Sequence, residues 1–378
     1  MILGITAAAL AATAVFNVHQ ARRVEHRNPP RGRFIEVDGV RLHYLEQGEG
    51  PPVVLLHGNV VTAEDFAYSG LLDLTAKSHR VIAFDRPGMG YSDRPNGRLW
   101  TPGAQADLLR RAFNRLAIER AVVVGHSLGA MVAAALALDH PTTVRGLVLL
   151  SGYFYPTARA DVALAAPPAI PVLGDVLRYT VSPLVGRALL PAVVKGMFAP
   201  RQIPADFAKH FPFGMSVRPS QIRASAQDAA AMIPAAAAMR HRYRELSMPL
   251  VIMAGREDRV AKVGRQASDC TRRSPTAQSV WCQTSGTCST TRCPRRSSPP
   301  LRPFRGRPVA PRTGRAATKK RRHYPEPTRD TDRFHRRGGR KRIVAPDGGE
   351  LAPSSKPQPD GTLVKALARV ALAGAPSP

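Results

Sequence analysis

Short apolar runs alternate with helical patterns through most of the chain. The apolar runs cover residues 52–56, 80–84, 121–124, 145–150 and 249–253, and the helical patterns cover 102–117 and 128–139. Runs that are apolar on both faces and separated by helices are typical of a parallel sheet covered on both sides. We therefore predict an α/β fold, with the chemistry at the carboxyl ends of the strands.

Two segments depart from this alternation. Residues 33–37 and 40–45 read as strands, and Asp38-Gly39 between them is a strong hairpin signal. Residues 153–245 are rich in Ala, Leu and Pro and show helical patches without a clear strand. We predict that 153–245 is an inserted helical cap or lid, with ordinary core helices as the alternative.

The N-terminal 18 residues are apolar except for Thr6, Thr13 and Asn17, and arginines follow at 22, 23 and 27. Because the positive charge comes after the apolar run, the positive-inside rule places the body in the cytoplasm. We predict that 1–18 is a hydrophobic membrane anchor. Two alternatives stay open: a cleaved signal with a secreted or periplasmic body, and a frayed apolar helix or mis-assigned start.

Charge and composition change near residue 268. The 378 residues carry a net charge of +28, of which 269–378 contribute +17 and 1–268 only +11. All four cysteines and 15 of the 35 prolines also follow residue 268. A uniformly basic nucleic-acid binder is therefore not expected. The stretch before residue 268 has no cysteine and gives no sign of a disulfide framework. The four later cysteines form no CxxC pair, so we predict no metal site.

The pattern VVVGHSLG over residues 122–129 has the form strand, GxSxG, helix. Small residues around Ser127 permit a sharp, strained turn that lifts its hydroxyl above the sheet. With a strand before it and a helix after it, this motif predicts a nucleophilic serine. The alternative is an ordinary strand-to-helix turn with a buried serine.

Together these motifs resemble the α/β-hydrolase fold family, in the branch with a helical cap. The resemblance is carried by LLHGN at 55–59, FDRPGMGYS at 84–92, the elbow at Ser127, and GREDRV at 255–260. It covers residues 30–268 and implies a mostly parallel sheet with an inserted cap. The first core segment would span residues 30–152, the cap 153–245 and the second core segment 246–268. The tail would follow at 269–378.

The resemblance also implies roles for individual residues. The backbone N–H groups of Asn59 and Leu128 would form the oxyanion hole, and Asp258 would be the triad acid. His57 and His126 are expected to be structural. Asp85 and Asp161 are weaker acid candidates. No phosphate or dinucleotide loop is present, so no cofactor is expected.

A serine nucleophile indicates acyl-serine chemistry on an ester or similar small acyl substrate. Family members that use Asp at this position, such as haloalkane dehalogenases and epoxide hydrolases, are poor matches. A cofactor-free perhydrolase and a C–C bond hydrolase remain alternatives, since both share the triad. A non-catalytic hydrolase-fold protein is a further alternative, with a basic tail that binds acidic partners or nucleic acid.

The triad histidine is missing from its expected place, roughly 25–30 residues after Asp258 as the resemblance implies. No histidine occurs between His241 and His323. His323 and His335 lie in an arginine-rich run without strand or turn signals and are poor substitutes. From the same composition we expect the last strand and helix of the sheet to be missing and the tail to be disordered.

Residues 269–378 are consistent with a shifted reading frame. In the shifted frame, each codon takes the third base of one written codon and the first two bases of the next. The codons for Asp269-Cys270 then encode Leu, those for Trp281-Cys282 encode Val, and those for Gly286-Thr287 can encode His. The shifted codons can therefore encode the residues of a strand, a turn and a Gly-His pair. We therefore hypothesise an out-of-frame translation, which predicts little turnover from the written chain. The alternative is a genuine basic, disordered arm.

Overall fold

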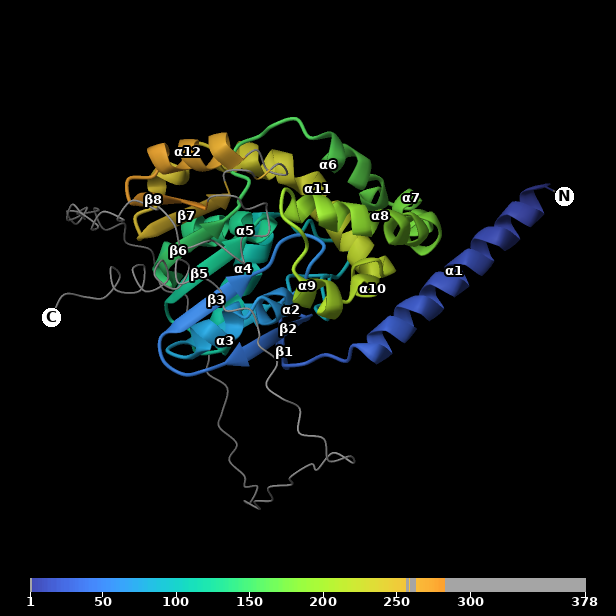
Figure 1. The fold of residues 1–378 in the computed structure, drawn as a ribbon, viewed down its shortest axis with the longest axis horizontal. Coiled ribbons are helices and arrows are strands. Elements are labelled where there is room, and N and C mark those ends of the chain that lie inside the picture. The colour runs from blue at the N-terminus through green and yellow to red at the C-terminus, as the bar shows by residue number, and fades with distance from the viewer. Residues whose placement is uncertain (1, 256–257, 259–262, 283–378) are drawn as a thin grey trace, which may run out of the picture. The chain divides into compact units, whose positions relative to one another are not determined.

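The strands of the described residues join one mixed sheet in the order β1-β2-β4-β3-β5-β6-β7-β8 (Figure 1). The structure is a computed structural model that describes residues 2–255, 258 and 263–282. The strands are β1 (Arg33–Val37), β2 (Val40–Gln47), β3 (Pro52–Leu56), β4 (Arg80–Phe84), β5 (Ala121–His126), β6 (Val144–Leu150), β7 (Leu250–Gly255) and β8 (Ala277–Cys282).

The predicted hairpin and parallel sheet are confirmed. β1 pairs antiparallel with β2 around Asp38 and Gly39, whose φ angles of 51° and 71° suit a tight two-residue turn. β2 also pairs antiparallel with β4. The remaining neighbours, from β4 to β8, run parallel, so their carboxyl ends meet at one edge of the sheet.

Both faces of the sheet are buried, which explains why its strands read as continuous apolar runs. Val54 and Leu56 belong to the cluster that includes side chains of α4 (Pro102–Arg115), α5 (Leu128–Asp139) and α12 (Val263–Arg273). The alternate residues Val53 and Leu55 belong to the cluster that includes α2 (Glu64–Tyr68) and α3 (Leu71–Ala76). This division follows from the two-residue period of a strand.

Helices α4 and α5 begin where the sequence indicates. Thr101 caps α4 by accepting a hydrogen bond from the Ala104 amide at 3.2 Å, and Pro102 occupies its first turn. α4 buries one stripe, whereas nearly every residue of α5 is buried. α5 is therefore a core helix, and its apolar composition reflects burial from all sides.

A helical insertion separates β6 from β7, in agreement with the helical pattern of 153–245 (Figure 1). Its helices are α6 (Ala160–Ala165), α7 (Leu173–Tyr179), α8 (Val181–Phe198), α9 (Ala205–His210), α10 (Phe213–Ser216) and α11 (Pro219–Met239). Leu190, Val194 and Phe198 of α8 form a separate apolar cluster with Phe207 and Phe211. Three 3₁₀ turns complete the helical elements, at Pro141–Thr143, Pro167–Ala169 and Tyr243–Glu245.

The N-terminal segment forms one helix, α1 (Ile2–Arg27), with exposed apolar side chains that include Val15 and Phe16. The side chain of Asn17 is buried and donates to the carbonyls of Tyr179 and Thr180. Among the described residues, the helix that is long and apolar enough to cross a membrane is α8, which belongs to the cap. A membrane anchor at 1–18 therefore stays a prediction.

The expectation that the last strand is missing is wrong. β8 (Ala277–Cys282) pairs parallel with β7. Before it, Cys270 of α12 and Ser274, which directly follows α12, are buried, and Ser274 Oγ donates to the Tyr243 carbonyl at 3.0 Å. The reading-frame hypothesis thus draws no support from Cys270 and Ser274, because both written residues pack against the core. The expected disorder of the tail, the missing last helix, and the candidates His323 and His335 concern residues outside the described part.

Candidate active site

The turn after β5 holds Ser127 in a strained backbone conformation. Its φ and ψ are 51° and −116°, and its amide donates to the Leu150 carbonyl at 2.8 Å. A Cβ on Gly125 would lie 2.5 Å from the Gly129 carbonyl oxygen, and a Cβ on Gly129 would lie 2.5 Å from the His57 carbonyl oxygen. Both glycines are therefore required by close backbone approach, which is the physical content of the GxSxG motif.

The loop after β3 lies against this turn. A Cβ on Gly58 would lie 3.2 Å from Ser127 Cβ, so the loop and the half-buried serine are direct neighbours. Asn59 follows Gly58, and its side-chain amide donates to the Ser225 carbonyl of α11 at 3.1 Å. Leu128 is buried at the first turn of α5, where the helix dipole favours negative charge. Asn59 therefore follows a loop residue that contacts Ser127, and Leu128 follows Ser127 directly in the chain.

His57 has both ring nitrogens in use. Burial, and then the Arg86 charge, lower the pKa of His57 to about 3, so the ring is neutral. Its Nδ1 donates to the Gly58 carbonyl at 2.7 Å, and its Nε2 accepts from the Arg86 amide at 3.0 Å. His57 therefore fixes the shape of this loop and has no free nitrogen for a proton transfer, as the resemblance implies.

His126 is also buried, directly before Ser127. Burial raises the pKa of the nearby Asp65, and the charge of His126 opposes that shift. A buried imidazole beside a buried carboxyl group suits a structural role beneath the elbow.

A buried ion-pair network supports the same loop from behind, and sequence reasoning missed it. Arg86 is fully buried and donates to the carbonyls of His57 at 2.9 Å and Gly58 at 3.0 Å. It also donates to Asp228 of α11 at 2.6 Å. Arg94 donates to the other oxygen of Asp228 at 3.0 Å. The network links the cap to the loop beside Ser127, so we name it the Arg86 network.

Asp258 is buried three residues after the end of β7. Because β5, β6 and β7 are parallel neighbours, Asp258 and Ser127 emerge at the same edge of the sheet. The weaker candidates are used elsewhere. Asp85 accepts a hydrogen bond from His43 at 2.7 Å. Asp161 of α6 pairs with Arg159, which directly precedes that helix. No histidine of the described residues follows His241, so no triad base is assigned.

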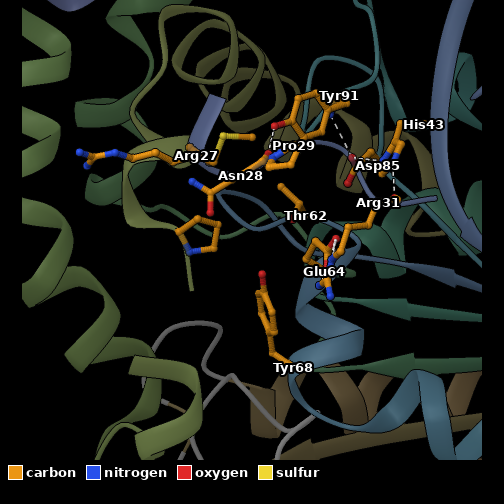
Figure 2. A pocket seen from close by; sticks show the side chains of 13 residues that line it. Arg27, Asn28, Pro29, Arg31, His43, Thr62, Glu64, Tyr68, Asp85 and Tyr91 are labelled. Atoms are coloured by element: carbon orange, nitrogen blue, oxygen red, sulfur yellow. Dashed lines mark hydrogen bonds and ion pairs between the residues drawn. The ribbon is translucent and has the colours of Figure 1, made fainter. Parts of the chain in front are cut away.

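A cavity of about 220 Å³ lies beside the His43–Asp85 pair (Figure 2). Tyr68 and Tyr91 contribute to its wall, together with Arg31, which pairs with Glu64. Asp85, one of the weaker acid candidates, lines this cavity, whereas Ser127, Asp258, Asn59 and Leu128 do not. Among the described residues, no three His, Cys, Asp or Glu side chains gather as they would around a metal ion.

Comparison with known proteins agrees with this geometry. Residues 51–283 match the family model described as alpha/beta hydrolase fold, and the chain belongs to that family of hydrolases. Over 124 residues it is 37% identical to a 2-hydroxymuconate semialdehyde hydrolase of Pseudomonas sp. strain CF600, covering 32% of this chain and 44% of the relative. Over 128 residues it is 30% identical to haloalkane dehalogenase 2 of Mycobacterium tuberculosis H37Rv, covering 34% and 44%.

Among solved structures, a meta-cleavage product hydrolase from Pseudomonas fluorescens IP01 superimposes with a TM-score of 0.55 at 25% identity. That match covers 68% of this chain and 91% of the other. An esterase from Exiguobacterium antarcticum gives 0.57 at 22% identity, with 68% and 92% covered, and shows the fold alone. In the sequence matches, the chain spans less than half the length of the two curated relatives.

Proposed function

We propose that Ser127 attacks the acyl carbon of a carboxylic ester or similar small substrate and forms an acyl-serine. The observation that carries this proposal is the backbone of Ser127, with φ at 51° and ψ at −116° between β5 and α5. Such strain persists only where the surroundings over-determine it, and it clusters at functional sites. The glycines at 125 and 129 provide that constraint, since neither position can hold a side chain.

The partners of Ser127 are proposed from their positions. The amides of Asn59 and Leu128 would donate to the oxyanion that forms when the serine attacks. Asp258, buried at the same edge of the sheet, would orient a histidine and stabilise its charged form. The Arg86 network would hold the His57–Gly58 carbonyls, and therefore the Asn59 amide, in place.

The base is absent from the described residues, so the written chain should turn over slowly. The out-of-frame hypothesis for the tail explains this absence, and the nucleotide sequence decides it. A uniform codon bias across residues 260–300 in the written frame would refute it. A frame-restored chain should gain esterase activity that Ser127→Ala removes.

Two other functions are kept as alternatives. The similarity to a 2-hydroxymuconate semialdehyde hydrolase favours C–C bond hydrolysis as the second candidate, because that chemistry uses the same kind of site. A cofactor-free perhydrolase would use the same kind of site. The non-catalytic alternative is a hydrolase-fold binder whose basic tail contacts acidic partners.

A serine-reactive fluorophosphonate probe separates the enzyme from the binder. Labelling of the frame-restored chain that disappears in Ser127→Ala supports the nucleophile. A frame-restored chain that folds but is not labelled supports the binder. Esters of increasing chain length, offered with a C–C substrate to the frame-restored chain, would then define the substrate class.

We also propose that α1 anchors the protein in a membrane, with the body in the cytoplasm. Support comes from its apolar first 18 residues, and from the exposed Ile5, Val15 and Phe16. Recovery of the full chain in the soluble fraction after cell lysis without detergent would contradict this proposal.

A further inference from the structure

A cavity of about 330 Å³ lies where the end of α1, β2, the loop after β4, α7 and the start of α11 meet. Two carboxylates line it, Glu25 and Asp93. Five arginines also line it, namely Arg41, Arg94, Arg178, Arg218 and Arg223, and we call it the arginine cavity. Its lining therefore carries an excess of positive charge.

The ion pairs around the cavity neutralise only part of that charge. Arg94 and Arg218 are buried and fixed, by Asp228 at 3.0 Å and by Glu25 at 2.7 Å. Arg41 is exposed, and its ion pair with Asp93 is looser, with 3.8 Å between Arg41 Nε and Asp93 Oδ2. Arg178 pairs with Asp175 at 2.8 Å, so three of the lining arginines have a close carboxylate and Arg41 has only a distant one.

Arg223 has no ion pair with any carboxylate of the described residues. Burial and the neighbouring Arg178 charge lower the pKa of Arg223, and Arg223 in turn helps to lower the pKa of Arg94. Burial is the largest cause of both pKa shifts, and the Asp175 charge partly opposes that of Arg223. The smaller contributions from neighbouring arginines reflect repulsion among guanidinium groups, which stay protonated at neutral pH. An anion in the cavity would relieve that repulsion.

The start of α11 adds a second source of positive potential. The helix has 21 residues, and no side chain caps its N-terminus. Ser220, in the first turn, lines the cavity. The uncapped first-turn amides and the helix dipole both favour an anion at this position.

We propose that the arginine cavity binds a phosphate group, either in a soluble phosphate compound or in a phospholipid headgroup. Planar guanidinium groups form paired hydrogen bonds with phosphate oxygens. A tetrahedral anion has enough oxygens to bind Arg41, Arg223 and the α11 amides together. Neither predicted catalytic residue, Ser127 or Asp258, lines the cavity, so the site is separate from the chemistry.

Inorganic phosphate, titrated calorimetrically into the full chain at fixed ionic strength, tests the proposal. Arg223→Gln should weaken binding roughly tenfold, as expected for the loss of one charge-assisted contact. Arg41→Gln, on an exposed side chain, provides a second variant that should fold normally. Arg115→Gln is the matched control, because it removes the same charge from an exposed site at the end of α4. Its affinity should stay within about twofold of the unmodified chain.

Binding to phosphatidylglycerol vesicles then separates the two sources. Vesicle binding that is lost in Arg223→Gln and displaced by phosphate identifies a lipid headgroup. Arg223-dependent phosphate binding without Arg223-dependent vesicle binding identifies a soluble compound. If Arg223→Gln and Arg41→Gln both bind phosphate as tightly as Arg115→Gln, the proposal is wrong and the affinity belongs to dispersed charge elsewhere on the chain.

Discussion

Removal of the Asp228 carboxylate should be among the most destabilising single changes in this protein. The carboxylate is buried and accepts from Arg86 at 2.6 Å, from Arg94 at 3.0 Å and from Gln105 at 3.2 Å. In Asp228→Ala the two guanidinium groups stay buried and lose their counter-ion. Breaking a buried ion pair in this way costs about 3–5 kcal/mol, because the remaining charge is not compensated.

Urea unfolding followed by circular dichroism measures this loss. The matched control is Asp161→Ala, which removes the carboxylate of an exposed ion pair with Arg159 and should cost about 0–1 kcal/mol. Asp228→Asn keeps hydrogen-bond acceptance without the charge and should fall between the two. If Asp228→Ala is no less stable than Asp161→Ala, the Arg86 network is not the structural link that we infer.

Three further predictions follow from the same structure. Gly129→Ala should destabilise the chain by about 1–3 kcal/mol in urea unfolding, because the new Cβ would clash with the His57 carbonyl. Gly103→Ala in α4 should stabilise it by about 0.5–1 kcal/mol, because its Cβ meets no close atom and alanine favours the helix. Burial lowers the pKa of His43, but the hydrogen bond and charge of Asp85 outweigh it, so the pKa is raised above 6.5. The pair therefore contributes its full stability below pH 6.5 and loses it as the pH rises through the raised pKa. Urea midpoints of the wild type and His43→Asn should therefore converge toward pH 9, and a constant difference from pH 5 to 9 would count against the pair. In the frame-restored chain, Ser127→Ala should remove fluorophosphonate labelling without changing the melting temperature, and labelling that persists would place the nucleophile elsewhere.

Much of the fold follows from local pattern. Strand positions were predictable because each strand is buried on both faces and reads as an apolar run. The elbow was predictable because Gly125 and Gly129 are required by backbone contacts that no other residue permits. Both signals lie within a few residues of the feature they specify.

β8 could not be predicted in the same way. Its sequence, AQSVWC, mixes polar and apolar residues and resembles the surrounding tail in composition. It becomes a strand because β7 offers an unpaired edge of backbone hydrogen-bonding groups. Pairing with that edge outweighs a weak local preference for a strand.

The sequence by itself determined the class of fold, and it predicted the elbow at Ser127 and the lack of a histidine between His241 and His323. Only the tertiary structure decided which charges meet. Arg86 and Asp228 are 142 positions apart, and the arginine cavity gathers side chains from a strand, a loop and three helices. Such contacts depend on how the cap and the N-terminal helix fold back against the sheet and its loops, and neither periodicity nor spacing along the chain encodes that path.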